Sequence, residues 1–298
     1  MASMKEIKNR IKSVRDTQKI TNAMYLISSA KMRKAKSELD KTRPYFNAVQ
    51  AEIKRIFRTV PDVDSRYFYP PEGSEKLNGT FGCLVITADR GLAGAYNHTV
   101  LKSALALREK HEDMKFFVVG EYGRQFFNHK KIPIEESFLY PAQNPTMQRA
   151  REISARLLED YDAGRLDKIF IIYTDLKNGL NAEPVETRIL PFHRGEFVDT
   201  TVQTAEFEFL PSVQAVLDSM IPSYVSGYVY SALVDSFCSE QNARMAAMNS
   251  AGQNADKILE GLTVQYNRVR QAGITREITE ISAGFKAQKK KRKKVEQK

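Results

Sequence analysis

Two long segments without proline, one at each end of the chain, constrain the fold more than any other feature. The first 43 of the 298 residues contain neither proline nor glycine, and no proline occurs in the 76 residues after Pro222. Both segments space their apolar residues as helices do. A helix of ~60 residues would be ~90 Å long, well beyond ordinary globular helices. Such a helix needs a packing partner, and the other terminal segment is the obvious one.

The N-terminal segment carries a heptad-like seam with a weak centre. Its apolar positions alternate spacings of four and three residues, and in the same register the central positions are polar or small. The seam consists of Ile7, Ile11, Val14, Gln18, Thr21, Tyr25, Ser28, Met32, Ala35 and Leu39. At Pro44 we expect an end or a kink in this helix, followed by a second helical stretch over 48–59.

Small residues are crowded in one zone of each terminal segment, which predicts a close antiparallel approach of the two helices. With residue 29 placed opposite residue 249, paired residue numbers sum to about 278, and the N-terminus ends opposite Gln271. The zones consist of Ala23, Ser28, Ser29 and Ala30 in the first helix, and of Ala243, Ala246, Ala247, Ser250, Ala251, Gly252 and Ala255 in the second.

Beyond that point the C-terminal helix still has an apolar stripe, formed by Ile274, Ile278, Ile281 and Phe285 at spacings of four, three and four. Each such side chain left in water forfeits ~1.5–3 kcal/mol relative to burial. The stripe therefore predicts insertion into a socket on another protein. The alternative is that this segment folds back onto the chain's own central domain.

The central region alternates strands and helices, which predicts a parallel, doubly wound α/β domain. Strands are expected at 81–87, 115–120 and 168–175, with an edge strand at 186–190. Helices are expected at 97–111, 121–129 and 146–162. The fold class is α/β: an antiparallel coiled coil of long N- and C-terminal helices flanks a Rossmann-like α/β domain. The expected boundaries are 1–60 for the first helix, 75–205 for the domain, 210–287 for the second helix, and 288–298 for a disordered basic tail.

A glycine-containing turn follows the first expected strand and invites comparison with nucleotide sites. Residues 88–97 read ADRGLAGAYN, which is neither GxGxxG nor GxxxxGK followed by Ser or Thr. Arg90 could serve as the cation of an anion site. The favoured interpretation is a tight turn leading into a helix capped by Asn97.

No other pattern predicts catalysis, a cofactor or a metal site. His98, His111, His129 and His193 are scattered, and Cys83 and Cys238 are expected to be unpaired thiols. Glu277 and Glu280 share a helix face and could form an acid pair, but contact with solvent or a partner is the better interpretation.

The chain has a net charge of +10, and its excess of positive charge lies at the two ends. Residues 1–60 carry +10, residues 286–298 carry +7, and the intervening segment carries −7. No apolar run reaches the ~18 residues of a membrane span. The first residues have no apolar h-region, so secretion is not expected.

Three segments resemble the γ subunit family of F-type ATP synthases. They are KEIKNRIKSVRDTQKITNAM with SSAKMRKAK near the start, TADRGLAGAYN in the central turn, and SEQNARMAAMNSAGQNA with RQAGITREITEISAG near the end. Phe285 departs from the family pattern, and the tail AQKKKRKKVEQK extends past the usual end. The resemblance spans essentially the whole chain.

The resemblance implies a non-catalytic central shaft. In that family the terminal helices form an antiparallel coiled coil inside a ring of α and β subunits. The α/β domain stands on the membrane c-ring beside the ε subunit. Ion-driven rotation of the ring and shaft forces the β catalytic sites through different nucleotide affinities, so nucleic acid and small-molecule substrates are not expected partners. The location implied is the bacterial cell membrane, peripherally on its cytoplasmic side.

The same resemblance implies partner contacts at particular residues. Lys19 and Met24 are expected near the β-subunit levers, with Arg244 facing the same zone. Arg270, Gln271 and Thr275 match family positions that bind a β-subunit loop, with Glu277 nearby.

Two alternatives remain open from the residues alone. The lysine-rich end could belong to a nucleic-acid-binding protein. The α/β domain could belong to a Rossmann-type enzyme.

Overall fold

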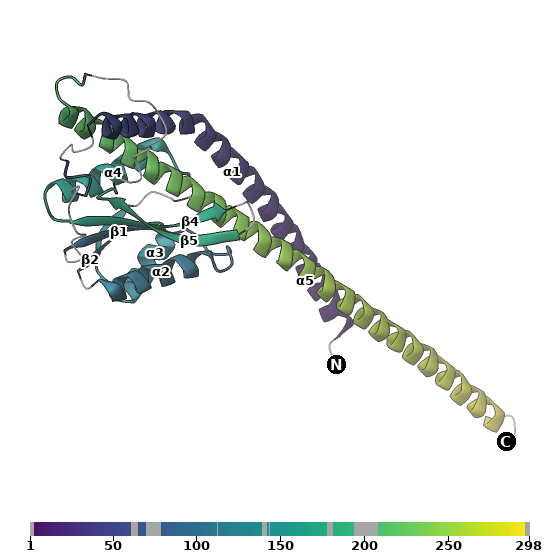
Figure 1. Ribbon diagram of the computed structural model, residues 1–298. Coiled ribbons are helices and arrows are strands. Elements are labelled where there is room, and N and C mark those ends of the chain that lie inside the picture. The colour runs from purple at the N-terminus through teal and green to yellow at the C-terminus, as the bar shows by residue number, and fades with distance from the viewer. Residues whose placement is uncertain are drawn as a thin grey trace. The chain divides into compact units, whose positions relative to one another are not determined.

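The computed structural model describes residues 3–60, 65–69, 79–111, 113–138, 142, 144–177, 181–193 and 208–295. Its longest elements are helices α1 (Met4–Thr59) and α5 (Val213–Val295), which enclose the α/β elements in chain order (Figure 1). The chain forms two compact units, one of Met1–Leu26 with Met248–Lys298 and one of Ile27–Ala247. Both terminal helices are therefore shared between the units, and the expected boundaries near 60 and 210 do not separate them.

The larger unit contains a five-stranded sheet in the order β3-β2-β1-β4-β5. The strands are β1 (Phe81–Ile86), β2 (Met114–Val119), β3 (Ile134–Phe138), β4 (Lys168–Lys177) and β5 (Asn181–Leu190). The first four are parallel, and β5 pairs antiparallel with β4 at the edge. The parallel sheet and the edge strand are as predicted. β3 was missed, because Glu135 and Glu136 interrupt the apolar pattern of this short outer strand.

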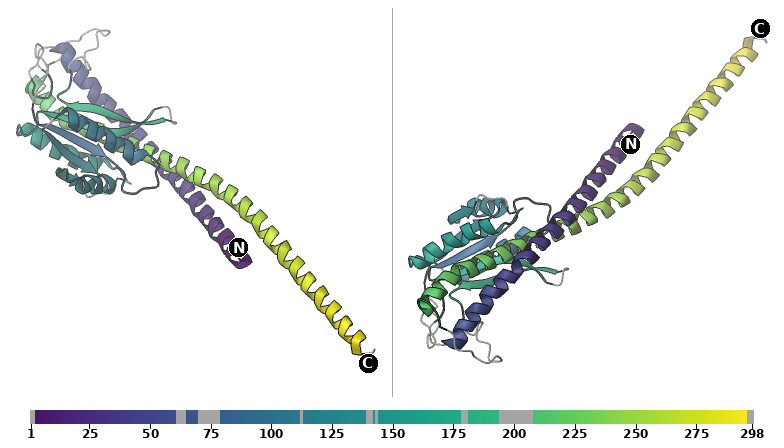
Figure 2. Two further views of the ribbon diagram at one scale, coloured as in Figure 1. Left: turned by 90° about the horizontal axis from the view of Figure 1, so that it is seen from below. Right: turned by 90° about the horizontal axis from the view of Figure 1, so that it is seen from above.

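Helices cover both faces of this sheet (Figures 1 and 2). Side chains alternate across a strand, so Leu84 and Ile86 of β1 join the core cluster that includes residues of α1, α4 and α5. Cys83 and Val85 join the opposite cluster with residues of α2 and α3. The three shorter helices are α2 (Tyr96–Lys110), α3 (Glu121–His129) and α4 (Met147–Asp162).

Within the larger unit, α1 and α5 pack closely at a glycine. A Cβ atom added to Gly227 of α5 would lie 2.0 Å from the ring of Phe46 on α1, so any larger residue would force the helices apart. Phe46 is two residues after Pro44, and α1 continues through this proline to Thr59. Of the two outcomes expected at Pro44, an end of the helix is therefore excluded. Packing of the segment that follows offsets the hydrogen bond that proline removes.

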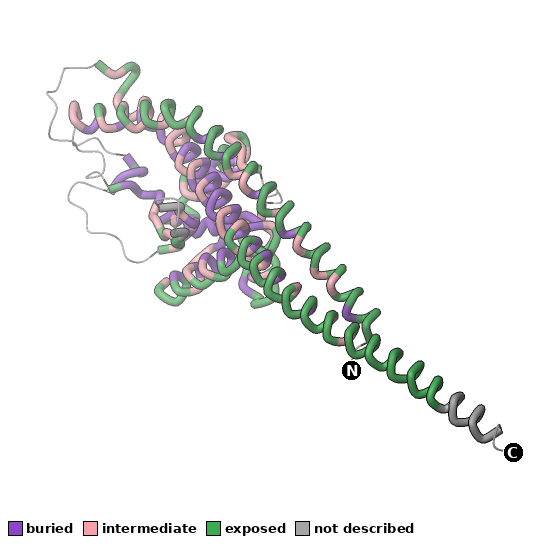
Figure 3. Tube along the Cα trace, turned by 90° about the vertical axis from the view of Figure 1, so that its right-hand side faces the viewer, coloured by how far each residue is buried: buried purple, intermediate pink, exposed green. Residues whose placement is uncertain are grey.

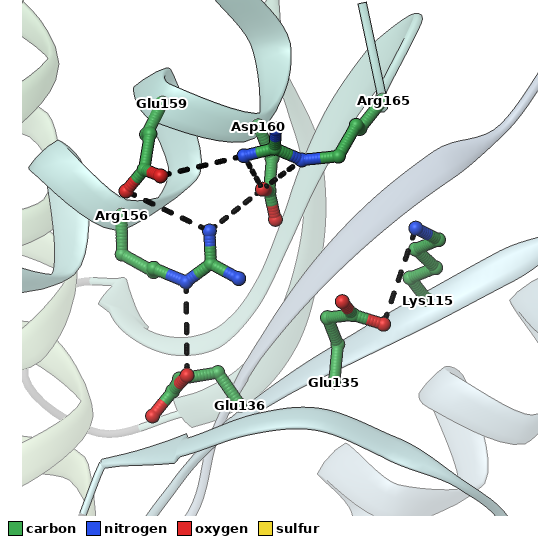
Figure 4. A network of polar contacts seen from close by, with 7 residues as sticks. All are labelled: Lys115, Glu135, Glu136, Arg156, Glu159, Asp160 and Arg165. Atoms are coloured by element: carbon green, nitrogen blue, oxygen red, sulfur yellow. Dashed lines mark hydrogen bonds and ion pairs between the residues drawn. The ribbon is translucent and has the colours of Figure 1, made fainter. Parts of the chain in front are cut away.

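A buried carboxylate joins α4 to the segment that follows it and, through an arginine, to the outer strand β3 (Figure 4). Asp160 accepts hydrogen bonds from Arg156 at 2.6 Å and Arg165 at 2.7 Å, and Arg156 lies 3.6 Å from Glu136 of β3. Burial alone would raise the pKa of Asp160, but the two arginines outweigh it and lower the pKa. The network anchors an edge strand that has few apolar contacts of its own.

The C-terminal segment differs from the expected disordered tail. α5 extends to Val295, so the backbone is helical over most of 288–298. Lysine, arginine and glutamine are good helix formers, and no glycine or proline follows Phe285 to stop the helix. No helix among the described residues combines the length and apolarity needed to cross a membrane.

We predict that Asp235→Asn stabilises the protein above about pH 6 but not at pH 4. Burial and the nearby Asp175 raise the pKa of Asp235 to about 6, although Arg43 and Lys36 oppose the shift. The folded state therefore holds this proton more tightly than the unfolded state, and stability falls as pH rises from about 4 to about 6. Urea unfolding should show a gain of about 1–2 kcal/mol at pH 8 and none at pH 4. Asp218→Asn, at an exposed site, is the control and should change neither value; an equal gain at both pH values for Asp235→Asn would contradict this account.

Candidate interaction surfaces

In the smaller unit, one face of α1 is turned inward as the heptad pattern predicts. The buried and half-buried positions of this face are Ile7, Ile11, Val14, Gln18, Thr21 and Met24. Tyr25 was expected in this seam, but its side chain is 38% exposed and Met24 takes its place. The substitution is local, because the next predicted positions, Ser28, Met32, Ala35 and Leu39, are buried or half-buried.

The inward face of α5 in this unit repeats the same spacing. It consists of Met248, Gly252, Ala255, Leu259, Leu262, Tyr266 and Val269. Gln18 donates a 2.6 Å hydrogen bond to Asp256, and Asn22 lies 3.7 Å from a Cβ added to Gly252. Moving four residues forward on α1 thus moves four residues back on α5, so the two helices are antiparallel, as predicted.

The predicted register is wrong by about one helical turn. Both observed pairs have residue numbers that sum to 274, not 278. The small-residue zones did not set the register, because Ala23 and Ala30 of α1 are exposed. On α5 only Gly252 and Ala255 of that zone are buried in this unit. The start of α1 is therefore level with about residue 270 of α5.

Past this level α5 continues without cover from α1. Every residue from 270 to 286 is exposed (Figure 3). The apolar stripe is exposed too: Ile274 by 48%, Ile278 by 59%, Ile281 by 73% and Phe285 by 68%. Within the described part of its own unit, therefore, nothing covers the stripe. This apolar surface is exposed to water, and a partner that buried it would lower the free energy of the system.

The predicted contact residues of this segment are also accessible. Arg270, Gln271, Thr275 and Glu277 are all exposed, and the Thr275 hydroxyl donates to the Gln271 carbonyl at 2.9 Å. Glu280 pairs with Arg276 at 3.0 Å, so an acid pair of Glu277 with Glu280 is not favoured. On α1, the Lys19 side chain is 80% exposed beside Asp16, whereas Met24 is half-buried.

Arg244 differs from the expectation that it faces a partner. This residue is only 9% exposed and lies inside the larger unit. Its guanidinium donates to the backbone carbonyls of Arg90 at 3.3 Å and Gly91 at 3.1 Å, and it pairs with Glu240 at 2.5 Å. Arg244 thus binds the glycine turn. The spacing of Glu240 and Arg244 by four residues is the one sequence signal that could have indicated an internal pair.

The turn at residues 88–97 is held together by a side chain of its own motif and by two left-handed backbone positions. Asn97 does not cap α2, whose N-cap is Ala95; its side-chain oxygen accepts from the Ala88 backbone N–H at 2.9 Å. Leu92 and Gly94 have left-handed backbones, with φ of 64° and 55°. The turn presents carbonyls to Arg244, and its Ala88 amide is already bonded, so a phosphate cradle at this turn is not supported.

The other candidate sites have no arrangement of side chains that indicates a ligand or a reaction. A cleft of about 310 Å³ between α1, α5 and residues 144–145 is lined by charges of both signs, Lys31 and Lys34 with Glu38, over an apolar floor. Within the described residues, no three His, Cys, Asp or Glu side chains are placed to hold a metal ion. Cys83 and Cys238 are both buried free thiols, as expected.

Comparison with known proteins assigns the chain to a family. The ATP synthase family model matches residues 3–288. The ATP synthase gamma chain of Caldanaerobacter subterraneus subsp. tengcongensis is 42% identical, over 94% of this chain and 98% of that protein. The chain belongs to the ATP synthase gamma chain family. The gamma chain of Acetivibrio thermocellus is 38% identical over 97% of this chain and its own full length.

Solved structures share the gamma-chain fold. A chain in the central stalk and c-ring structure of the Tetrahymena thermophila mitochondrial ATP synthase aligns with a TM-score of 0.60 and 23% identity, covering 78% of this chain and 99% of that one. A chain in the OSCP, F1 and c-ring structure of the Euglena gracilis enzyme aligns with a TM-score of 0.55 and 15% identity, covering 89% and 95%. These structures confirm the predicted fold class, and the family model and the relatives confirm the predicted family.

We predict that Gly252→Leu loosens the coiled coil of this gamma chain. Gly252 is buried against Asn22, and the atoms of a leucine beyond Cβ would push the helices apart. Hydrogen exchange over residues 4–26 should become at least tenfold faster. Gly261→Leu is the matched control, because its Cβ would meet nothing within 4 Å and the helix gains up to about 0.8 kcal/mol of propensity. Equal protection in the two variants would show that Gly252 does not set the helix approach.

Proposed function

We propose that this chain is the central rotor shaft of an F-type ATP synthase and has no catalytic site of its own. The exposed stripe at the end of α5 carries the proposal, because an apolar helix face beyond the coiled coil requires a socket. Because the chain belongs to the gamma-chain family, we infer that this socket is formed by a ring of α and β subunits. Lys19, Met24, Arg270, Gln271, Thr275 and Glu277 are the proposed contacts with that ring.

Ion flow through the c-ring would turn the α/β domain, and with it the two helices, inside the stationary ring. Successive β subunits would then meet different faces of the shaft and change their nucleotide affinity in sequence. The ε subunit and the c-ring would bind the α/β domain, and the complex would lie peripherally on the cytoplasmic side of a bacterial membrane.

The charge distribution is consistent with this role. A shaft that slides past repeated subunits is impeded by deep interlocking contacts, whereas long-range charge attraction is smoother and screened over ~8 Å at physiological salt. Residues 1–60 carry a net charge of +10, and most lysines and arginines of this segment are exposed. Acidic surfaces on the surrounding β subunits would complement them.

The stripe can be tested by co-expression with α and β subunits. We expect Ile278→Asp to weaken retention of the chain by at least tenfold, because a carboxylate enters an apolar socket. Ala283→Asp adds the same charge to the same exposed segment but faces away from the stripe, and we expect a loss below threefold. Circular dichroism should show full helix content in both. Retention of Ile278→Asp at the wild-type level would overturn the socket.

The two alternative functions are tested on the isolated chain. We expect no saturable ATP or NAD binding below millimolar concentration in calorimetric titration; micromolar binding would favour a Rossmann-type enzyme. Deletion of residues 286–298 should leave assembly with α and β intact. Sequence-independent DNA binding that is tight in the full chain and lost on this deletion would favour a nucleic-acid-binding role.

A further inference from the structure

A buried polar joint ties α5 to the α/β domain close to where the helix leaves the larger unit. Arg244 lies three residues before Ala247, the last residue of that unit on α5. Its guanidinium binds two backbone carbonyls of the turn after β1 and the carboxylate of Glu240. Burial raises the pKa of Glu240, and the Arg244 charge opposes that shift, so each side chain makes burial of the other tolerable.

The turn that Arg244 binds is itself fixed to the sheet. Asp89 accepts from the Glu121 backbone N–H at the start of α3 at 3.1 Å. The Thr87 hydroxyl donates to the Val119 carbonyl at 2.9 Å and accepts from the Gly123 N–H at 3.0 Å. Gly120 approaches so closely that an added Cβ would lie 2.2 Å from the Thr87 carbonyl oxygen. The turn therefore moves with β1, β2 and α3.

A second set of bonds joins the same helix to β4. Ser236 accepts from the Thr174 backbone N–H at 3.2 Å, and Ser239 donates to the Thr174 carbonyl at 3.1 Å. Hydrogen bonds weaken steeply when their angle changes, whereas apolar contacts are non-directional. Rotation of α5 about its own axis would break these polar bonds at a small angle. They therefore add directional resistance to that of the close-packed core around the helix.

We propose that Arg244 is a positioning residue for torque transfer: with the turn at Arg90 and Gly91 it locks α5 against rotation relative to the α/β domain. This inference rests on the proposed rotor function. Torque delivered to the domain reaches the coiled coil through this joint. Without the joint, α5 would rotate relative to the α/β domain when torque is applied. Part of each rotation would then be lost before it reaches the catalytic ring.

The test uses the assembled, membrane-bound complex carrying Arg244→Met, which keeps the stem of the side chain and removes its donors. Glu240→Gln is added so that no buried charge is left unpaired. We expect ATP hydrolysis within about twofold of wild type, but ion pumping per ATP reduced at least threefold against a steep gradient. Thermal angular fluctuations of the shaft should widen in single-molecule recordings. Lys102→Met, on the exposed face of α2, is the control and should match wild type.

Arg244→Lys provides a milder second variant. It keeps the charge beside Glu240, but its single nitrogen cannot bind Glu240 and both carbonyls at once, as Nη1 and Nη2 of the arginine do. We expect an intermediate loss of pumping, which carries the test if the double variant does not fold. A purely structural role would lower hydrolysis and pumping in proportion, and this result, or unchanged pumping and stiffness, would overturn the joint. Failure of the proposed function is distinguishable, because the wild-type chain would then not assemble with the ring at all.

Discussion

The antiparallel packing of α1 against α5 is the constraint on which the rest of the structure depends. Neither helix could be stable at such a length alone, since long helices in water rely on a buried face. In the smaller unit the two helices bury one seam each, and in the larger unit they form part of the core beneath the sheet. Gly227 marks a point where any side chain would separate them.

The two compact units divide two physical tasks. The smaller unit presents an exposed helix segment with an apolar stripe beside exposed polar residues. The larger unit holds α5 with an apolar core and with directional bonds from Ser236, Ser239 and Arg244. The core fixes the position of the helix, and the polar bonds add resistance to a change of its angle.

Prediction from sequence succeeded where a pattern repeats over many residues. The heptad of α1, the exposed stripe of α5 and the apolar strands β1, β2 and β4 each depend on periodicity, which local physics dictates. It failed at β3, where two glutamates hide a short edge strand, and at Asn97, which bonds Ala88 instead of capping α2. It also failed at the one-turn register of the coil, because small residues permit a close approach without selecting one.

The sequence by itself determined that two long helices exist, that they need each other, and that residues 274–285 of the second keep an apolar face. Those properties follow from residue spacing and from the long segments without proline. Only the tertiary structure decided what Arg244 does. Its carbonyl partners are separated from it by 153 and 154 positions, and backbone carbonyls carry no sequence signal. An exposed arginine and a buried one look alike until the fold brings its acceptors within reach.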